Sequence, residues 1–195
     1  MGRDGERYNN EARLVLTGLQ TSFWNAQRGC LYDVIGPSSR DPRIRPNQLF
    51  TLSLPYRMLD RERARLVVDT IQKNLLTPVG LRTLELKDPA YEPRFEGGVA
   101  QRDGAYHQGS VWPWLIGPFI AAHLYAYGES DQALSFCRQI LSRFEAELAA
   151  CCLGSLSEVY DADSPHRPGG CPAQLWSIAQ LILACNRVGR DVDRA

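Results

Sequence analysis

Apolar residues recur every three to four positions along most of the chain, which is the spacing of one face of an α-helix. This pattern predicts six helices joined by loops, with few strands. The expected helices span residues 5–24, 49–54, 60–75, 110–127, 130–148 and 172–188. A short extended segment is expected at 31–35, where the apolar run is too short for a helix. The pattern therefore predicts an all-α fold.

Residues that favour helix ends support several of these boundaries. Asp60, Ser110 and Ser130 precede the third, fourth and fifth helices and are expected to cap them. Pro172 is expected to open the sixth helix, because the first helical position needs no N–H donor. Gly128 is expected to end the fourth helix. That helix is apolar nearly all round, so it should be buried.

The stretch between residues 77 and 108 lacks helical or alternating periodicity. Irregular segments of this length are uncommon in compact domains and often carry function. A disordered linker is the alternative, but aromatic residues and arginines such as Arg82, Tyr91 and Arg94 argue against it. We therefore expect this stretch to belong to a functional region.

Composition narrows the class of protein. The 195 residues carry no formal net charge, which argues against nucleic acids and anionic membranes as partners, because both reward a basic excess. No apolar run approaches the roughly 18 to 20 residues that span a membrane. The polar N-terminal segment lacks the apolar core of a signal peptide. A cytoplasmic setting is expected.

The six cysteines suggest neither a disulfide framework nor a zinc site, because their spacing is irregular and no Cys-x-x-Cys pair occurs. The three histidines, His107, His123 and His166, show no ligand spacing either. No metal and no other cofactor is expected. Free thiols are consistent with a reducing compartment.

The most informative stretch leads into the fourth helix and joins polar groups to two indoles. Tyr106, His107 and Gln108 come first, and Trp112 and Trp114 follow at the start of the apolar run. Hydroxyl-rich ligands need fixed hydrogen-bond donors and acceptors, and the apolar face of a sugar ring needs an aromatic surface. The stretch therefore suggests a binding site for a neutral sugar. The alternative is a tight polar turn beside two core tryptophans.

Four blocks of sequence resemble the glycogen debranching enzyme family, in its amylo-alpha-1,6-glucosidase domain. A single short match would carry little weight, but the four occur in the family's order across most of the chain. The blocks cover residues 29–35, 44–48, 106–119 and 157–158, the last followed by 170–174.

The resemblance implies a catalytic domain built as an (α/α)6 toroid, with six inner and six outer helices. The six helices expected here make about half of such a ring, so residues 1–195 are expected to be the C-terminal half of that domain. The implied partners are a branched alpha-glucan substrate and an upstream half of the domain. A half ring would expose the apolar faces that its missing partner covers.

Glycoside hydrolysis usually needs two carboxyl groups, one that protonates the leaving oxygen and one that activates water or attacks carbon. The resemblance implies that Glu158 activates water in an inverting reaction, although it could instead cap a helix or pair with Arg167. The family's proton donor lies in an upstream Trp-Met-Asp stretch that this chain lacks. Asp33 or Asp103 could replace it, but each fits better as an acceptor for glucose hydroxyls. The other loop carboxylates considered are Asp41, Glu96, Asp161 and Asp163.

Side chains with hydrogen-bonding groups in the loops are the expected substrate ligands. Arg45 and Arg82 have two open roles, since each could donate to sugar oxygens or hold loop carboxylates in place. Trp112 and Trp114 are expected to form a stacking wall, with one of the two in the core. The full set of expected substrate-binding residues is Asp33, Arg45, Asn47, Gln48, Arg82, Asp103, Tyr106, His107, Gln108, Trp112 and Trp114.

The leading hypothesis is part of an amylo-alpha-1,6-glucosidase, a glycoside hydrolase that releases glucose from a glycogen branch stub and is incomplete by itself. Three alternatives stay open. One is a binding or interaction module that binds glucan without turnover. Another is a degenerate fragment that neither folds alone nor binds. The third is a different toroid glycosidase, such as a trehalase- or glucoamylase-like enzyme.

Overall fold

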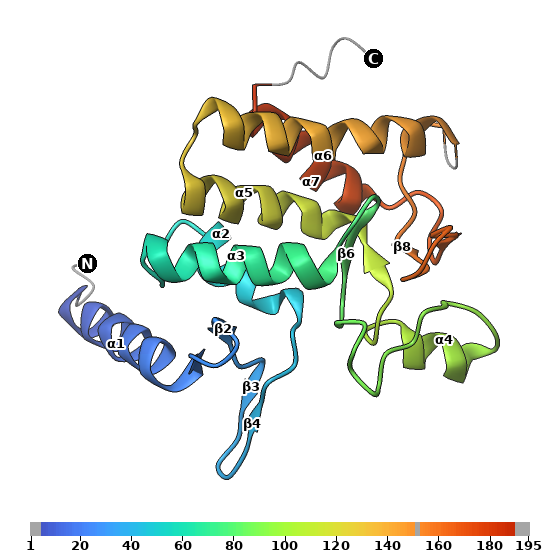
Figure 1. The fold of residues 1–195 in the computed structure, drawn as a ribbon. Coiled ribbons are helices and arrows are strands. Elements are labelled where there is room, and N and C mark those ends of the chain that lie inside the picture. Colours follow the sequence, from blue (N-terminus) through green and yellow to red (C-terminus); the bar gives the residue numbers. More distant parts are fainter. Residues whose placement is uncertain (1–4, 151–152, 190–195) are drawn as a thin grey trace.

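The computed structural model describes residues 5–150 and 153–189, and seven α-helices form the main elements of this part of the chain (Figure 1). The helices are α1 (Gly5–Gly18), α2 (Phe50–Ser53), α3 (Arg61–Leu75), α4 (Val99–Ala105), α5 (Ile116–Tyr127), α6 (Asp131–Ala150) and α7 (Leu175–Arg187). Short helical turns extend three of them, at Leu19–Phe23 after α1, Pro46–Leu49 before α2 and Pro113–Leu115 before α5. The predicted helical class is confirmed.

Helix α5 lies at the centre of the packing. Ten of its twelve residues are buried, which confirms the expectation for an apolar helix. It packs against α2, α3, α6 and α7, and α3, α5 and α6 lie side by side with α7 behind them (Figure 1). Gly117 leaves room for Gln180 of α7, since a Cβ at position 117 would collide with that side chain. The small residues of α5 thus let its neighbours approach closely.

A five-stranded antiparallel sheet, which the sequence pattern did not predict, joins distant parts of the chain. Its strands in order are β5 (Leu76–Thr77), β6 (Gly80–Arg82), β7 (Val111–Trp112), β8 (Val159–Tyr160) and β9 (Pro168–Gly169). Two small hairpins lie elsewhere, one of β1 (Trp24–Asn25) with β2 (Cys30–Leu31) and one of β3 (Val34–Ile35) with β4 (Arg40–Asp41). Strands of two or three residues are too short to show an alternating pattern. The sheet brings the 106–114 stretch next to residue 158.

Two of the expected helix caps are confirmed. The Oδ1 atom of Asp60 accepts a hydrogen bond from the Arg63 N–H at 2.8 Å, one residue before α3. The Ser130 hydroxyl accepts from the Ala133 N–H at 3.3 Å, before α6. Gly128 follows α5 with φ of 77°, as expected of a helix-ending glycine.

Two expected helix starts were wrong. Ser110 does not cap a helix; its hydroxyl donates to the Ala105 carbonyl at 2.9 Å, and α5 begins only at Ile116. The reason is that residues 111–112 pair with β6 and β8 as a strand. Pro172 does not open α7, which begins at Leu175. The 77–108 stretch also contains a helix, α4, that its sequence did not reveal.

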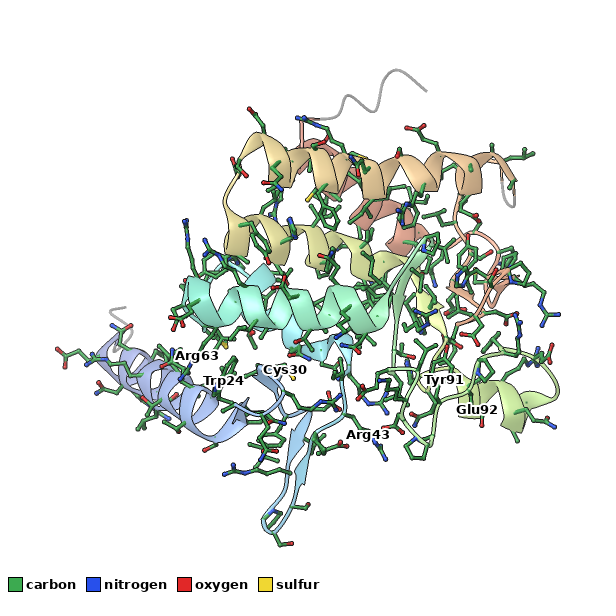
Figure 2. The ribbon with its side chains drawn as sticks, in the orientation of Figure 1. Trp24, Cys30, Arg43, Arg63, Tyr91 and Glu92 are labelled. Carbon is green, nitrogen blue, oxygen red and sulfur yellow. The ribbon has the colours of Figure 1, made fainter. Side chains whose placement is uncertain are left out.

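The segment after α1 is held to α3 by an arginine. Figure 2 shows Arg63 beside Trp24, with the guanidinium carbon 4.9 Å from the centre of an indole ring. Arg63 also donates to the carbonyl of Gln20 at 3.3 Å. A cation over an aromatic face stabilises such a contact modestly. This contact fixes the start of the folded core without burying α1.

Several apolar side chains lie on the surface. Helix α1 has no buried residue, and Tyr8 and Val15 of its expected core face are each 61% exposed. On α7, Leu175 and Leu183 are 78% and 58% exposed. Exposed apolar faces of this extent mark interaction surfaces.

Two expected absences can be compared with the structure. No helix within residues 5–150 and 153–189 has the length and hydropathy to cross a bilayer. In the same part of the chain, no three His, Cys, Asp or Glu side chains gather to hold a metal ion. Among the described cysteines, Cys30, Cys137 and Cys171 are free thiols, while residues 151 and 152 lie outside the described part.

Candidate active site

Both carboxylate oxygens of Glu158 have fixed hydrogen-bond donors. The Tyr106 hydroxyl donates to Oε1 at 2.6 Å, and the backbone N–H of Cys171 donates to Oε2 at 2.9 Å. The Glu158 N–H in turn donates to the Cys171 carbonyl at 2.8 Å. Gly170 has φ of 69°, and a Cβ there would lie 2.5 Å from Oε2. A glycine is therefore required beside this carboxylate.

Tyr106 lies in a cluster of rings. Its ring centre is 4.7 Å from that of Trp112, 4.8 Å from that of His107 and 5.7 Å from that of Phe95. The Trp112 indole N–H donates to the Tyr106 carbonyl at 3.0 Å. Burial, followed by the hydrogen bond to Glu158, raises the pKa of Tyr106 to about 12. At neutral pH the tyrosine is therefore a donor.

Arg45 holds the turn that carries Tyr106. Its guanidinium donates to the His107 carbonyl and, at 2.7 Å, to the side-chain oxygen of Gln108. It also donates to the Thr83 carbonyl at 3.1 Å, and its Nε lies 3.5 Å from Oδ2 of Asp33. The side chain is only 13% exposed. Of its two expected roles, the structure places Arg45 in an internal network with a carboxylate and a loop.

Four expected substrate ligands line one cavity of about 120 Å³, namely Asp33, Arg45, Asn47 and Gln48. Asn47 donates to Oδ1 of Asp33 at 2.8 Å and is exposed. Gln48 is buried; it accepts from the Leu31 N–H at 3.1 Å and donates to the Arg45 carbonyl at 3.2 Å. Gln48 therefore holds the cavity wall. Asp33, with a side chain 10% exposed, faces Arg45 and Asn47 with its two oxygens, so the exposed Asn47 is the better placed of the two to reach a ligand.

Arg82 and Asp103 lie apart from that cavity. Arg82 donates to the Ala162 carbonyl at 3.0 Å and approaches Asp163 to 3.8 Å. Asp103 is exposed on α4, where its charge contributes to the raised pKa of Tyr106. Asp103 is thus close enough to Tyr106 to affect its pKa, whereas Arg82 pairs with the loop carboxylate Asp163.

The two expected stacking residues differ in exposure. Trp112 is only 6% exposed and stacks on the exposed His107 at 5.5 Å between ring centres. Trp114 is half-buried between Phe50 at 5.8 Å and Trp176 at 4.4 Å. Trp112 is therefore the core member of the pair.

Burial and the charge of Arg45 lower the pKa of His107, which keeps it neutral at pH 7.

A family model described as amylo-alpha-1,6-glucosidase matches residues 1–183. The chain belongs to this family. Glycogen debranching enzyme of Saccharomyces cerevisiae is 26% identical over 177 residues, a match that covers 80% of this chain and 12% of the yeast protein. The chain is thus a glycoside hydrolase family member that spans about an eighth of the length of this relative.

Solved structures with the same fold come from other glycosidases. Neutral trehalase of Saccharomyces cerevisiae has a TM-score of 0.65 at 14% identity, covering 92% of this chain and 30% of the trehalase. Mannosylglycerate hydrolase of Thermus thermophilus has a TM-score of 0.60 at 17% identity, covering 91% of this chain and 38% of the hydrolase. The fold is that of part of an (α/α)6 toroid, which confirms the predicted class.

Of the loop carboxylates, Asp161 is the most deeply engaged. It is 2% exposed and accepts from the Phe95 N–H at 2.8 Å, from Arg167 at 2.8 Å and from Arg94 at 3.1 Å. Burial by itself raises the pKa of Asp161, but these three donors outweigh it, so the pKa lies below its usual value. Arg167 thus pairs with Asp161 and Glu96.

The lowered pKa of Asp161 makes stability depend on pH. Its ionised form stabilises the fold fully above the unfolded pKa near 3.8, and this contribution is lost as the pH falls through the lower folded value. We expect Asp161→Asn to lower the free energy of unfolding by about 2 kcal/mol at pH 7, with a smaller difference below about pH 4. Urea denaturation at several pH values measures this. Glu129→Gln, at an exposed carboxylate, should change neither quantity; an equal loss at pH 2 and pH 7 would contradict the assignment.

Sequence reasoning missed two residues that contact the Tyr106–Glu158 pair from neighbouring loops. Phe95 and Cys171 contact the Tyr106–Glu158 pair through a ring and a backbone N–H. Cys171 stood in a matched block, but a backbone donor leaves no side-chain signal. Trp176, which packs against Trp114, was visible only as a helix residue.

Proposed function

We propose that residues 1–195 form the C-terminal half of the catalytic domain of an inverting amylo-alpha-1,6-glucosidase. The substrate would be the alpha-1,6-linked glucose stub of a glycogen branch, and Glu158 would be the general base. The observation that carries this proposal is the Glu158 carboxylate, held by Tyr106 and the Cys171 N–H beside a ring cluster. Membership of the family supports the substrate class.

In this mechanism Glu158 takes a proton from a water molecule as the water attacks the anomeric carbon. Each carboxylate oxygen has more than one lone pair, so the bonds from Tyr106 and Cys171 leave room to accept from water. A second carboxyl group must protonate the leaving oxygen from the opposite side of the sugar. We assign that acid to the upstream half of the domain. The exposed Asn47, which Asp33 holds by a hydrogen bond, is the best placed of the proposed sugar ligands in this cavity.

A groove on the exposed face supports a partner that completes the ring. The groove has a volume of about 250 Å³ between α2, α5 and α7, and Phe50, Trp114, Leu183 and Arg187 are among the residues that line it. It joins the exposed apolar side chains of α7. The chain covers 30% of the trehalase and 38% of the mannosylglycerate hydrolase. Helices of the upstream half are therefore the proposed occupant. The cytoplasmic setting stays a prediction.

Reconstitution tests the proposed function. We expect this chain mixed with its upstream half to release glucose from a branched limit dextrin, with the β-anomer as the first product seen by proton NMR, because inversion of an alpha linkage gives β-glucose. The chain by itself should show no turnover. Initial release of the α-anomer, or equal activity of the isolated chain, would contradict the proposal.

A surface variant tests the docking face in the same assay. Leu183→Asp should weaken assembly with the upstream half at least about tenfold, because it places a charge in the apolar groove. Leu86→Asp changes a similarly exposed leucine outside the groove and should assemble normally. Light scattering measures both. Equal assembly of the two variants would reject this face.

A glucan-binding fragment is the second candidate, and the contact of Trp114 with Trp176, which is 48% exposed, favours it. An aromatic surface of this kind can bind a sugar ring without any chemistry. Calorimetry with an isomalto-oligosaccharide separates the candidates: binding without turnover in the reconstituted protein supports the fragment.

A further inference from the structure

We propose that Arg45 and Tyr106 are positioning residues that aim Glu158, rather than ligands of the sugar. They act through one path, in which Arg45 fixes the 106–109 turn and the turn presents the Tyr106 hydroxyl to Oε1 of Glu158. The inference rests on the proposed function, because it assumes that Glu158 is the base. The path from Arg45 through the turn to Glu158 can be tested by a tyrosine titration, which needs no activity assay.

The Tyr106 hydroxyl has its single proton committed. It donates to Oε1 at 2.6 Å, a short distance typical of a hydroxyl bound to a carboxylate. Trp112, His107 and Phe95 surround the ring and leave it little freedom to turn toward a ligand. Tyr106 therefore fixes one oxygen of Glu158, and the Cys171 N–H fixes the other.

The guanidinium of Arg45 suits a bracing role. One of its nitrogens reaches the carbonyls of Thr83 and His107, a second reaches the Gln108 side chain, and the third faces Asp33. These bonds tie the residue after β6 to the 106–109 turn across more than twenty positions of the sequence. A lysine would keep the charge but could not span these acceptors with a planar fork. The shape of arginine is thus what the turn requires.

Another tyrosine–carboxylate pair in the chain provides an internal comparison. Tyr127 donates to Asp69, and burial together with that bond raises the pKa of Tyr127 to about 12. Tyr127 lies at the end of α5, and Arg45 makes no contact with it among the described interactions. Tyr127 therefore shares the chemistry of Tyr106 but not the path, which makes it a matched control.

The first experiment is a tyrosine titration on the full chain labelled at the ring carbon that carries the hydroxyl. In the parent, Tyr106 should titrate near pH 12. Arg45→Lys should move the Tyr106 pKa downward, because a loose turn weakens the bond to Glu158, and Glu158→Gln should move it further. The Tyr127 pKa should stay unchanged in both variants. If Arg45→Lys leaves the Tyr106 pKa unchanged, the proposed link from Arg45 through the turn to Glu158 is wrong, whether or not the protein is active.

The second experiment uses the reconstituted enzyme and separates kcat from KM. Tyr106→Phe should lower kcat about 10- to 100-fold, the usual cost of a misplaced catalytic group, with KM within about twofold. A sugar ligand would instead raise KM. Tyr127→Phe should leave both constants within about twofold of the parent. A raised KM with unchanged kcat in Tyr106→Phe would reject the positioning role.

Non-additivity supplies the decisive comparison. Arg45→Lys should lower kcat about tenfold in the parent but less than about twofold in the Tyr106→Phe background, because both changes break the same path. Gln108→Met removes one of the Arg45 hydrogen bonds and should lower kcat less than Arg45→Lys does, again only when Tyr106 is intact. This variant replaces Arg45→Lys in the test if that variant fails to fold. Fully additive losses would overturn the inference. If the titration behaves as expected but Glu158→Gln stays active, the path stands and the base assignment fails.

Discussion

Glu158→Gln is expected to lower kcat of the reconstituted enzyme about 10²- to 10⁴-fold, with little change in KM. Glutamine keeps the size of the side chain, and its single amide oxygen can still accept one of the two hydrogen bonds that Tyr106 and the Cys171 N–H donate to Glu158. It cannot take a proton from water, and general base catalysis contributes about this factor. Steady-state glucose release from a branched limit dextrin measures the loss.

A matched control separates the loss of the base from a general loss of negative charge. Glu96→Gln changes an exposed carboxylate that pairs with Arg167, close in sequence to Phe95 but bonded away from Glu158. We expect this variant to retain activity within about twofold. If Glu158→Gln keeps more than about a tenth of the parent kcat, another group must activate the water.

Gly80→Ala is expected to destabilise the fold by about 4 kcal/mol, the largest stability effect foreseen for a single methyl group. Gly80 has φ of 142°, in the region that favours glycine, and such strain costs about 1–3 kcal/mol in other residues. A Cβ would lie 2.6 Å from the Trp112 carbonyl oxygen and 2.8 Å from the Pro113 Cα, so it would also force β6 from β7. Overpacking of this kind adds about 1–3 kcal/mol.

Thermal and urea unfolding measure this effect. A loss of about 4 kcal/mol should lower the melting temperature by about 8–16 °C in a chain of this size. Gly104→Ala is the control, because nothing lies within 4 Å of a Cβ there and the residue sits inside α4. That variant should be neutral or slightly stabilised. Equal melting temperatures for the two variants would contradict the prediction, because they would show that β6 and β7 leave room for a Cβ at residue 80.

Apart from α4, the helices were predictable because each has a periodic apolar face or a recognisable end. Asp60 and Ser130 cap the helices expected of them, and α5 is buried as its uniform apolar character indicated. The ring class followed from the resemblance, not from periodicity. The carboxylate proposed as the base could likewise be named only from its block, since a lone Glu158 has no pattern of its own.

The parts that could not be predicted depend on contacts between distant residues. Each strand of the five-stranded sheet has two or three residues, so pairing and not local sequence makes it extended. Ser110 does not cap α5 as expected, because the pairing of residues 111–112 in the sheet moves the start of that helix to a later residue. Arg45 had two open roles, and the bonds to residues 83, 107 and 108 that favour the bracing role join parts of the chain that local sequence does not relate.

Helix α1 makes any union of the two halves thermodynamically expensive. Its 14 residues bury nothing of their own, and isolated helices of about 12–15 residues are marginal in water. The contact energy gained by covering Tyr8 and Val15 must therefore first offset the entropy of holding this segment helical. The two proposed halves would then bind each other less tightly than the area of their interface suggests. The concentration of one half would determine what fraction of the other half is assembled and active.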